Sequence, residues 1–165
     1  MLPVILQPAG SEDASLHYSE TITSPPPLKY FEPFLSEEEY SHLIVHVYED
    51  ENEPVPVWGV TRGKKNVNRN QWEGIFVNSI CLFAKNKQIF SSAQITKKFH
   101  NSELANELWG LDQNGNTWEY IFLLKNVTPQ AIDVKDIAEC LEYSPSFNVQ
   151  RFQVLEGSKA EIIYD

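Results

Sequence analysis

The stretch Ile75-Phe-Val-Asn-Ser-Ile-Cys-Leu-Phe-Ala84, Lys85-Asn-Lys87, Gln88-Ile-Phe-Ser-Ser-Ala-Gln-Ile95 decides the fold class of this chain. Two runs rich in apolar and β-branched residues flank a short polar connection, which predicts two antiparallel strands joined by a tight hairpin. Three other runs have a similar composition, at Val55–Thr61, Trp118–Leu124 and Arg151–Leu155. Several short strands at this spacing indicate a small β-barrel.

Helical segments are expected between these strands, which makes the predicted fold class α+β. Ser36-Glu-Glu-Glu39 has the form of a capping box, and apolar residues at helical spacing follow it. We therefore expect a helix from about Ser36 to Tyr48. Shorter helices are expected at Val67–Glu73, Asn101–Leu108 and Val134–Cys140.

The first 33 residues differ in composition from the rest of the chain. They contain Pro25-Pro26-Pro27 and clusters of Ser and Thr, without a sustained apolar period. This composition is typical of an extended arm or linker. We expect an arm over residues 1–33 and one domain over residues 34–165, with the barrel core at about residues 55–165. A chain of 165 residues has room for one core of ordinary size and such an arm.

Hydropathy and cysteine content indicate a soluble chain. Apolar residues make up 42% of the sequence, but no apolar run approaches the ~18 to 20 residues that cross a bilayer, so no membrane partner is expected. The chain contains two cysteines, Cys81 and Cys140. Two cysteines suggest reduced core thiols in a cytoplasmic protein more than a disulfide framework.

Charge is distributed unevenly along the chain. The segment from Arg62 to Lys98 holds eight basic residues and one acid, a net charge of +7, whereas the remaining residues carry −17, for a total of −10. Contacts to phosphates need Lys and Arg, so the basic segment is the expected footprint of a nucleic acid. Solvated turns of an acidic protein are the alternative explanation for the same lysines.

Catalytic and metal-binding patterns are incomplete. His42 and His46 stand four residues apart, as zinc ligands on a helix do, but the acid that follows the first His in metalloproteases is missing, and no third ligand is apparent. The sequence has no Gly-rich phosphate loop, nucleophile elbow or Cys-x-x-Cys pair. We therefore predict a binding module, not an enzyme, without a metal or cofactor.

The four tryptophans suggest what this module binds. Trp118 alternates with Tyr120 and Phe122 along an expected strand, which predicts a core position. Trp58 lies near a strand end, just before the basic loop, and Trp109 precedes a turn. Rings at such places suit a flipped base, because stacking contributes roughly 1 to 3 kcal/mol per base. A buried core position is the alternative for Trp58.

The order of these motifs resembles the YTH and EVE domains of the PUA-like superfamily. The resemblance covers about residues 55–165 and rests on the runs Val57-Trp-Gly-Val-Thr61 before an Asn-rich loop, Ile80–Ala84, Ile89–Ile95 and Trp118–Val127. Two other stretches are similar to the specificity modules of McrB-type modification-dependent restriction enzymes, namely Leu108-Trp-Gly-Leu-Asp112 with Thr117–Phe122, and the tail Tyr143–Leu155.

This resemblance implies a small PUA-like β-barrel flanked by short helices, in which an aromatic cage holds 6-methyladenine or 5-methylcytosine. Trp58 matches the first cage tryptophan, and Trp109 is a looser match to the second. The chain departs from the eukaryotic pattern at Gly59, where those domains have Ser, and in the acidic segment Tyr48–Glu53, which replaces a Lys-Ser-Asn segment. The remaining candidates for the pocket are Asn66, Asn68, Trp72 and Asp112.

The expected function is a DNA-binding specificity module that flips a methylated base into this cage and targets a modification-dependent restriction complex. The restriction motor or nuclease would then lie in another domain or subunit. Alternatives are an RNA-binding reader of the YTH or PUA type and an acidic protein-interaction domain with no nucleic-acid role. The residues expected to contact the phosphates of the nucleic-acid backbone are Arg62, Lys64, Lys65, Arg69, Lys97 and Lys98.

Overall fold

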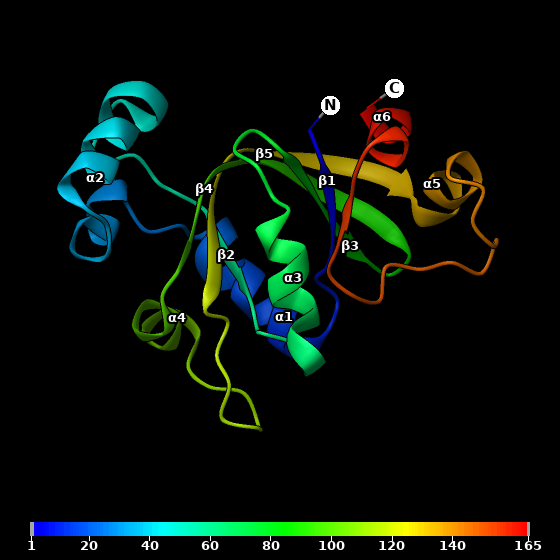
Figure 1. Ribbon diagram of the computed structural model, residues 1–165, viewed down its shortest axis with the longest axis horizontal. Coiled ribbons are helices and arrows are strands. Elements are labelled where there is room, and N and C mark those ends of the chain that lie inside the picture. Colours follow the sequence, from blue (N-terminus) through cyan, green and yellow to red (C-terminus); the bar gives the residue numbers. More distant parts are fainter. Residues whose placement is uncertain (1, 165) are drawn as a thin grey trace.

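One six-stranded sheet organises the computed structural model, which describes residues 2–164. The strand order is β2-β5-β4-β3-β1-β6, and the sheet curls into a half-barrel (Figure 1). All neighbouring strands are antiparallel except β1 and β3, which are parallel. The strands are β1 Val4–Pro8, β2 Val57–Val60, β3 Ile80–Lys85, β4 Gln88–His100, β5 Tyr120–Asp133 and β6 Gln153–Leu155.

Short helices surround the sheet. In Figure 1, α1 and α3 lie over one face, while α2 and α4 stand at one end and α5 and α6 at the other. Within residues 2–164, no helix is long and apolar enough to span a bilayer. The α-helices are α1 Glu12–Tyr18, α2 Glu37–Leu43, α3 Val67–Glu73, α4 Ser102–Trp109, α5 Val134–Cys140 and α6 Ser158–Tyr164. Helical turns of other pitch lie at Ser19–Thr23, Leu28–Phe34, Ile44–Tyr48 and Lys64–Asn66.

The expected hairpin and helices are present. The capping box closes as predicted, because the Ser36 hydroxyl accepts from the Glu39 amide and the Glu39 carboxylate accepts from the Ser36 amide. Strands β4 and β5 run 13 and 14 residues, well beyond the predicted ends. Their pairing contains three register shifts, which break the alternation of apolar and polar residues by which a strand is detected in a sequence.

The expectation of an extended arm over residues 1–33 is wrong. Strand β1 lies inside the sheet between β3 and β6, and α1 follows it. Ile5 and Leu6 have no exposed surface. In a sequence, a strand that is buried on both faces is seen as a short continuous apolar run. The run Val4-Ile-Leu6 is so short that it cannot be distinguished from an apolar stretch of a loop. The core therefore begins near residue 4 and not at about residue 55.

Both faces of the sheet are covered by apolar clusters. The cluster beneath α1 and α3 contains Ile5, Trp58, Phe83 and Phe122. On the opposite face, one cluster packs against α5 and α6 and another against α2 and α4. Cys81 is buried in the first cluster, where burial raises the pKa of its thiol. Cys140 is exposed, so only one of the two expected core thiols lies in the core.

Candidate functional site

A cavity of about 320 Å³ opens on the face of the sheet that α1 and α3 cover. This volume is at the lower end of the roughly 300 to 1,000 Å³ that small-ligand pockets occupy. Five separate segments of the chain meet there: the continuous segment of β1 and α1, the end of β2, the start of α3, the loop before β5 and the loop before β6. The lining residues are Gln7, Pro8, Ser11, Ala14, His17, Trp58, Gly59, Val60, Thr61, Asn68, Trp118, Gln150, Arg151 and Phe152.

Aromatic rings form part of this wall. Trp58 is 3% exposed and belongs to the core cluster, so its ring serves both the core and the cavity. Trp118, which the sequence placed in the core, is half-buried, and its ring meets that of His17 edge-on with centroids 4.3 Å apart. Burial lowers the pKa of His17, against the opposing effect of Glu20 and Asp13, so the imidazole is neutral at pH 7. Flat, uncharged rings of this kind suit stacking with a planar ligand.

Trp109 lies behind this wall. A Cβ atom added to Gly59 would stand 2.7 Å from the ring of Trp109 and 2.3 Å from the carbonyl oxygen of Trp118. Successive residues of a strand point to opposite faces, so Trp109 covers the side of β2 that Trp58 does not face. Trp109 does not line the cavity. The two rings expected to sandwich a base therefore lie on opposite sides of β2, and the cavity has Trp118 and His17 in its wall instead.

The other expected pocket residues have structural contacts. The Asp112 carboxylate accepts from the amides of Asn114 and Asn116 and closes the turn after α4. The Trp72 indole donates to the carbonyl oxygen of Ile121 at 3.2 Å, which holds α3 on the sheet. Asn66 has a left-handed backbone and does not reach the cavity, whereas Asn68 does.

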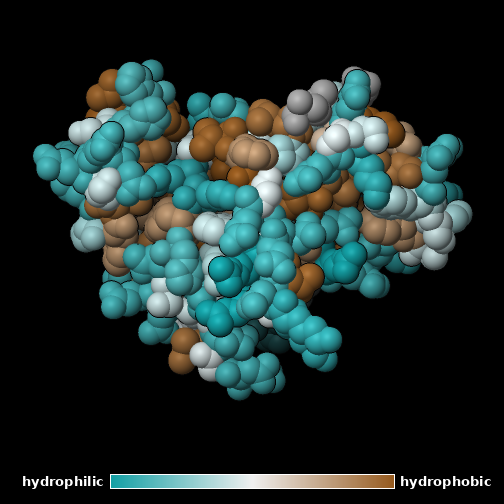
Figure 2. All heavy atoms as spheres, in the orientation of Figure 1, coloured by the Kyte–Doolittle hydropathy of each residue, from teal (hydrophilic) through white to brown (hydrophobic). Residues whose placement is uncertain are grey.

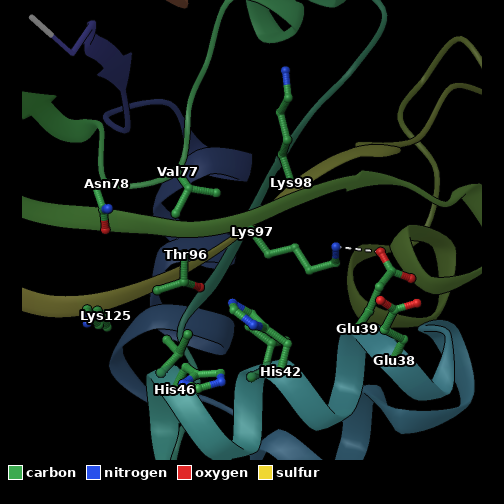
Figure 3. Close-up of a pocket in the computed structure, with 12 residues that line it drawn as sticks. Glu38, Glu39, His42, His46, Val77, Asn78, Thr96, Lys97, Lys98 and Lys125 are labelled. Carbon is green, nitrogen blue, oxygen red and sulfur yellow. Dashed lines mark ion pairs between the residues drawn. The ribbon is translucent and has the colours of Figure 1, made fainter.

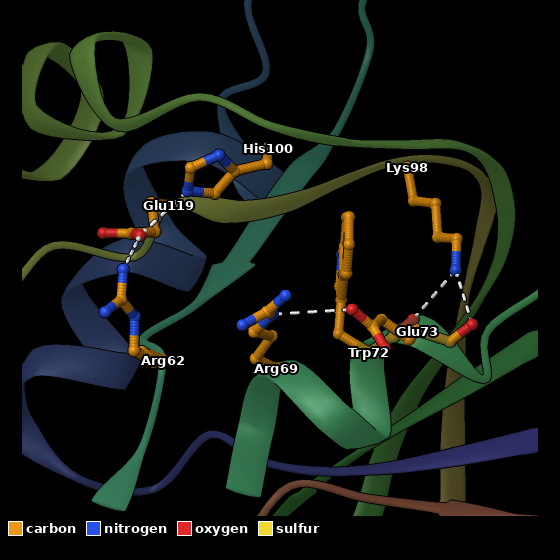
Figure 4. A network of polar contacts seen from close by, with 7 residues as sticks. All are labelled: Arg62, Arg69, Trp72, Glu73, Lys98, His100 and Glu119. Atoms are coloured by element: carbon orange, nitrogen blue, oxygen red, sulfur yellow. Dashed lines mark hydrogen bonds and ion pairs between the residues drawn. The ribbon is translucent and has the colours of Figure 1, made fainter. Parts of the chain in front are cut away.

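Two of the six lysines and arginines expected at phosphates are engaged in the fold. The Lys97 ammonium pairs with Glu39 and joins β4 to α2. The Lys98 ammonium donates to the carbonyl oxygens of Trp72 and Glu73 at 3.1 and 2.8 Å and so caps the end of α3 (Figure 4). It also lies 4.8 Å from the centre of the Trp72 ring. These contacts stabilise the fold and make both lysines poor candidates for phosphate contacts.

The other four basic residues lie close in sequence to two residues of the cavity wall, Thr61 and Asn68. They lie in or just after the loop that Thr61 and Asn68 attach to the cavity wall. Arg62 and Arg69 are exposed and form ion pairs with Glu119 and Glu73 at 3.5 and 3.4 Å (Figure 4). Exposed pairs of this type are weak and easily exchanged. Lys64 and Lys65 are also exposed and have no ion pair within residues 2–164.

The sequence interpretation missed most residues of the cavity wall, among them Gln7, His17 and Arg151. Gln7 and His17 lie in the segment taken for an arm, and Arg151 lies in the tail after α5. Arg151 is exposed, and in the described part of the chain it has no ion pair, so it adds a free cation to the cavity wall. The apolar run Val4-Ile-Leu6 is the sequence signal next to Gln7, but it is too short to identify a buried strand by itself.

A larger cavity of about 590 Å³ lies between α2 and β4. Figure 3 shows Lys97 reaching toward Glu39, while Lys98 points away from the α2 side of β4. The rings of His42 and His46 are 5.0 Å apart, yet no group of three or more possible metal ligands occurs among residues 2–164. No tryptophan lines this cavity, and its charges are of both signs, so it is less suited to a base or a phosphate backbone.

Comparisons with known proteins connect this fold with one solved complex. No protein-family model matches the sequence, and no curated protein matches it either. The chain is similar to the structure "N-terminal domain of Thermococcus gammatolerans McrB bound to m5C DNA", with a TM-score of 0.64 and 14% identity over 98% of this chain and 95% of that chain. It is also similar to an ASCH structure from Zymomonas mobilis, with a TM-score of 0.49 and 7% identity over 98% and 93% of the two chains. The first similarity confirms the expected PUA-like α+β fold.

Proposed function

We propose that this chain is a DNA-binding module that recognises a methylated base by receiving the flipped base in the cavity beside Trp58. The observation that carries the proposal is the position of this aromatic-walled cavity, which opens directly next to the basic loop Arg62–Arg69. The fold it shares with a domain solved in complex with m5C DNA supports the same function.

The energetics of base flipping agree with this arrangement. Extrusion of a base costs a few kcal/mol, and stacking on a ring returns roughly 1 to 3 kcal/mol per base. Contacts of the basic residues beside the cavity with phosphates supply the remaining free energy that extrusion of the base requires. In Figure 2, the surface in front of α3 is mainly hydrophilic, as a surface facing a phosphate backbone must be. The proposed phosphate contacts are Arg62, Lys64, Lys65, Arg69 and Arg151.

In this proposal the chain binds and does not catalyse. A restriction motor or nuclease, in another domain or subunit, would act on the DNA that the module has located. Trp58 and Trp118 would stack on the base, His17 would close the cavity edge, and Gly59 would keep the backbone of β2 close to Trp118. Trp109 would support this wall from behind.

The test is a titration of labelled DNA duplexes that are identical except for unmodified cytosine or adenine, 5-methylcytosine or 6-methyladenine at one position. Trp118→Ala is the informative variant, because Trp118 is half-buried whereas truncation of Trp58 would open the core. Tyr143→Ala is the matched control, because Tyr143 is a half-buried aromatic residue outside the cavity. The methyl-dependent affinity should fall about tenfold or more in Trp118→Ala and persist in Tyr143→Ala.

Circular dichroism of each variant shows whether it is folded. A single-stranded RNA with 6-methyladenine forms a second arm, which separates a DNA reader from an RNA reader. Absence of methyl-dependent binding by the wild type at low salt contradicts the proposed function. In that case the acidic interaction domain becomes the better explanation of the charge.

A further inference from the structure

Two buried polar atoms on the cavity wall lack a hydrogen-bond partner among residues 2–164. They are the Oε1 atom of Gln7 and the Nε1 atom of Trp58. Both residues are more than nine-tenths buried, at 6% and 3% exposure. Few buried polar groups in native structures are unpaired, and each exception calls for an explanation, of which a ligand that completes the hydrogen bonding is one.

The two side chains reach the cavity from distant strands. Gln7 lies on β1 and Trp58 on β2, which three other strands separate in the sheet. The side chain of Gln7 points to the same face as that of Ile5, two residues earlier, and Ile5 and Trp58 belong to one cluster beneath α1 and α3. The curl of the half-barrel therefore brings both residues into the wall of one cavity.

The contacts of Gln7 and Trp58 determine which of their atoms can still accept or donate a hydrogen bond. The Nε2 atom of Gln7 donates to the carbonyl oxygen of Pro8 at 2.7 Å, which orients the amide and leaves Oε1 as the free acceptor. The Trp58 indole can only donate. The residues of the cavity wall thus hold one unpaired acceptor and one unpaired donor, beside rings that suit a planar ligand.

We infer that Gln7 is a specificity-determining residue of the proposed site, an inference that rests on the proposed function. Its Oε1 atom accepts from the exocyclic amino group of a flipped cytosine or adenine, and Trp58 donates to the adjacent unprotonated ring nitrogen. Thymine and guanine carry a carbonyl oxygen where these bases carry the amino group, which would place two acceptors face to face. A methyl at C5 of cytosine, or a single methyl at N6 of adenine, leaves an N–H for Gln7.

The experiment compares bases that differ in this donor and retain the methyl group. Each base is placed opposite an abasic site, so that extrusion breaks no base pair. One pair is 5-methylcytosine and thymine, and the other is N6-methyladenine and 6-methoxypurine. Wild-type protein should prefer the base with the amino group about tenfold, and Gln7→Met should reduce the preference to less than about threefold. The measured quantity is the ratio of dissociation constants.

Gln88→Met is the matched control, because Gln88 is exposed at the start of β4 and does not line this cavity. It should retain the full preference. A second readout is the unfolding midpoint of Gln7→Met, which should fall only modestly, since the substitution removes one hydrogen bond, to the Pro8 carbonyl, together with an unpaired acceptor. If this variant is unstable, Gln7→Leu, which also lacks an acceptor oxygen, should show the same reduced preference.

The outcomes separate this inference from the function on which it rests. If the wild type distinguishes no methylated base from its unmodified counterpart, the proposed function fails. If methyl-dependent binding is present and is lost in Trp118→Ala, but Gln7→Met keeps the full preference for the amino base, only the role of Gln7 is overturned. Equal preference of the wild type for both members of each pair also overturns it.

Discussion

The contact between Gly59 and Trp109 shows how one residue determines the shape of the candidate site. Because Gly59 has no side chain, the ring of Trp109 and the carbonyl oxygen of Trp118 lie directly against β2. The ring of Trp109 then supports the cavity wall from outside. The Gly that departs from the Ser of the resembling domains is therefore a packing requirement of this chain.

Gly59→Ala should destabilise the protein by about 1 to 3 kcal/mol, because the new methyl group would overlap backbone and ring atoms that cannot move freely. Gly10→Ala is the control, since its Cβ would have only ordinary contacts at 3.5 Å or more. Urea unfolding of the two variants measures the difference. Equal unfolding free energies would contradict the packing of Trp109 on β2.

Two buried tyrosines provide a second test at this scale. The Tyr48 hydroxyl donates to the carbonyl oxygen of Leu124 at 2.8 Å and lies 2.6 Å from the Thr96 hydroxyl, whereas the Tyr40 hydroxyl is buried without a partner among residues 2–164. Tyr48→Phe should cost about 1 to 3 kcal/mol because it leaves buried partners unpaired. Tyr40→Phe should be neutral or stabilising. Thermal unfolding compares them, and an equal loss in both would refute the hydrogen-bond assignment.

Among the elements, α2 has the most clearly defined electrostatic attachment. Its capping glutamate, Glu39, also pairs with Lys97 on β4. The pKa of Glu39 falls to about 2 from an ordinary 4.5, first because of Lys97 and then because of the backbone amide of Ser36. One carboxylate thus caps the helix and attaches it to the sheet.

A carboxylate whose pKa is lowered by folding stabilises the native state above its unfolded pKa, and this contribution disappears as the pH falls from about 4.5 to about 2. Glu39→Gln should therefore be less stable than the wild type at pH 7, and the difference should shrink across this window. Glu37→Gln, which changes an exposed acid in the same first turn, is the control. The measurement is the urea midpoint at several pH values. A difference for Glu39→Gln that does not change with pH would contradict the ion pair.

Strand β1 shows why an element can be overlooked in a sequence. It is five residues long, precedes a proline-rich stretch and has no alternation of apolar and polar residues. Its stability comes from parallel pairing with β3 and antiparallel pairing with β6, both distant along the chain. Local sequence carries no information about those partners.

The whole molecule has a net charge of −10, so a DNA-binding role must rely on a local basic surface. Acidic residues cluster on α2 and in Glu49–Glu53, at one end of the fold, while the basic loop lies beside the cavity. Long-range repulsion from the acids is screened over about 8 Å at physiological salt. The five basic residues beside the cavity can therefore act on phosphates despite the overall charge.

Five phosphate contacts predict a plot of log affinity against log salt with a slope no steeper than about −4.5. The double variant Lys64→Ala, Lys65→Ala should make this slope shallower by about 2 and weaken binding equally for methylated and unmodified duplexes. Lys29→Ala, Lys135→Ala is the control, because both lysines are exposed and lie outside the loop. An unchanged slope for the first double variant would exclude the loop from the DNA interface.

The sequence by itself determined the helices with local signals, such as the capping box at Ser36, and the hairpin through Lys85–Lys87, because neighbouring residues encode them. It also indicated Trp58 and the basic loop, since their position in a familiar order of motifs is a property of the chain alone. The resemblance to PUA-like domains placed the fold correctly.

Only the tertiary structure decided which residues share the cavity. Gln7, His17 and Arg151 enter it because the sheet curls and places β1 between β3 and β6, which no local pattern specifies. The tertiary structure also places Trp109 outside the cavity and uses Lys97 and Lys98 in contacts that stabilise the fold. Neither could be known from the sequence, because the face to which a side chain points and the partner of a charge depend on contacts between residues far apart in the chain. A binding site built from five segments is set by long-range packing, and long-range packing is the part of folding that local sequence does not encode.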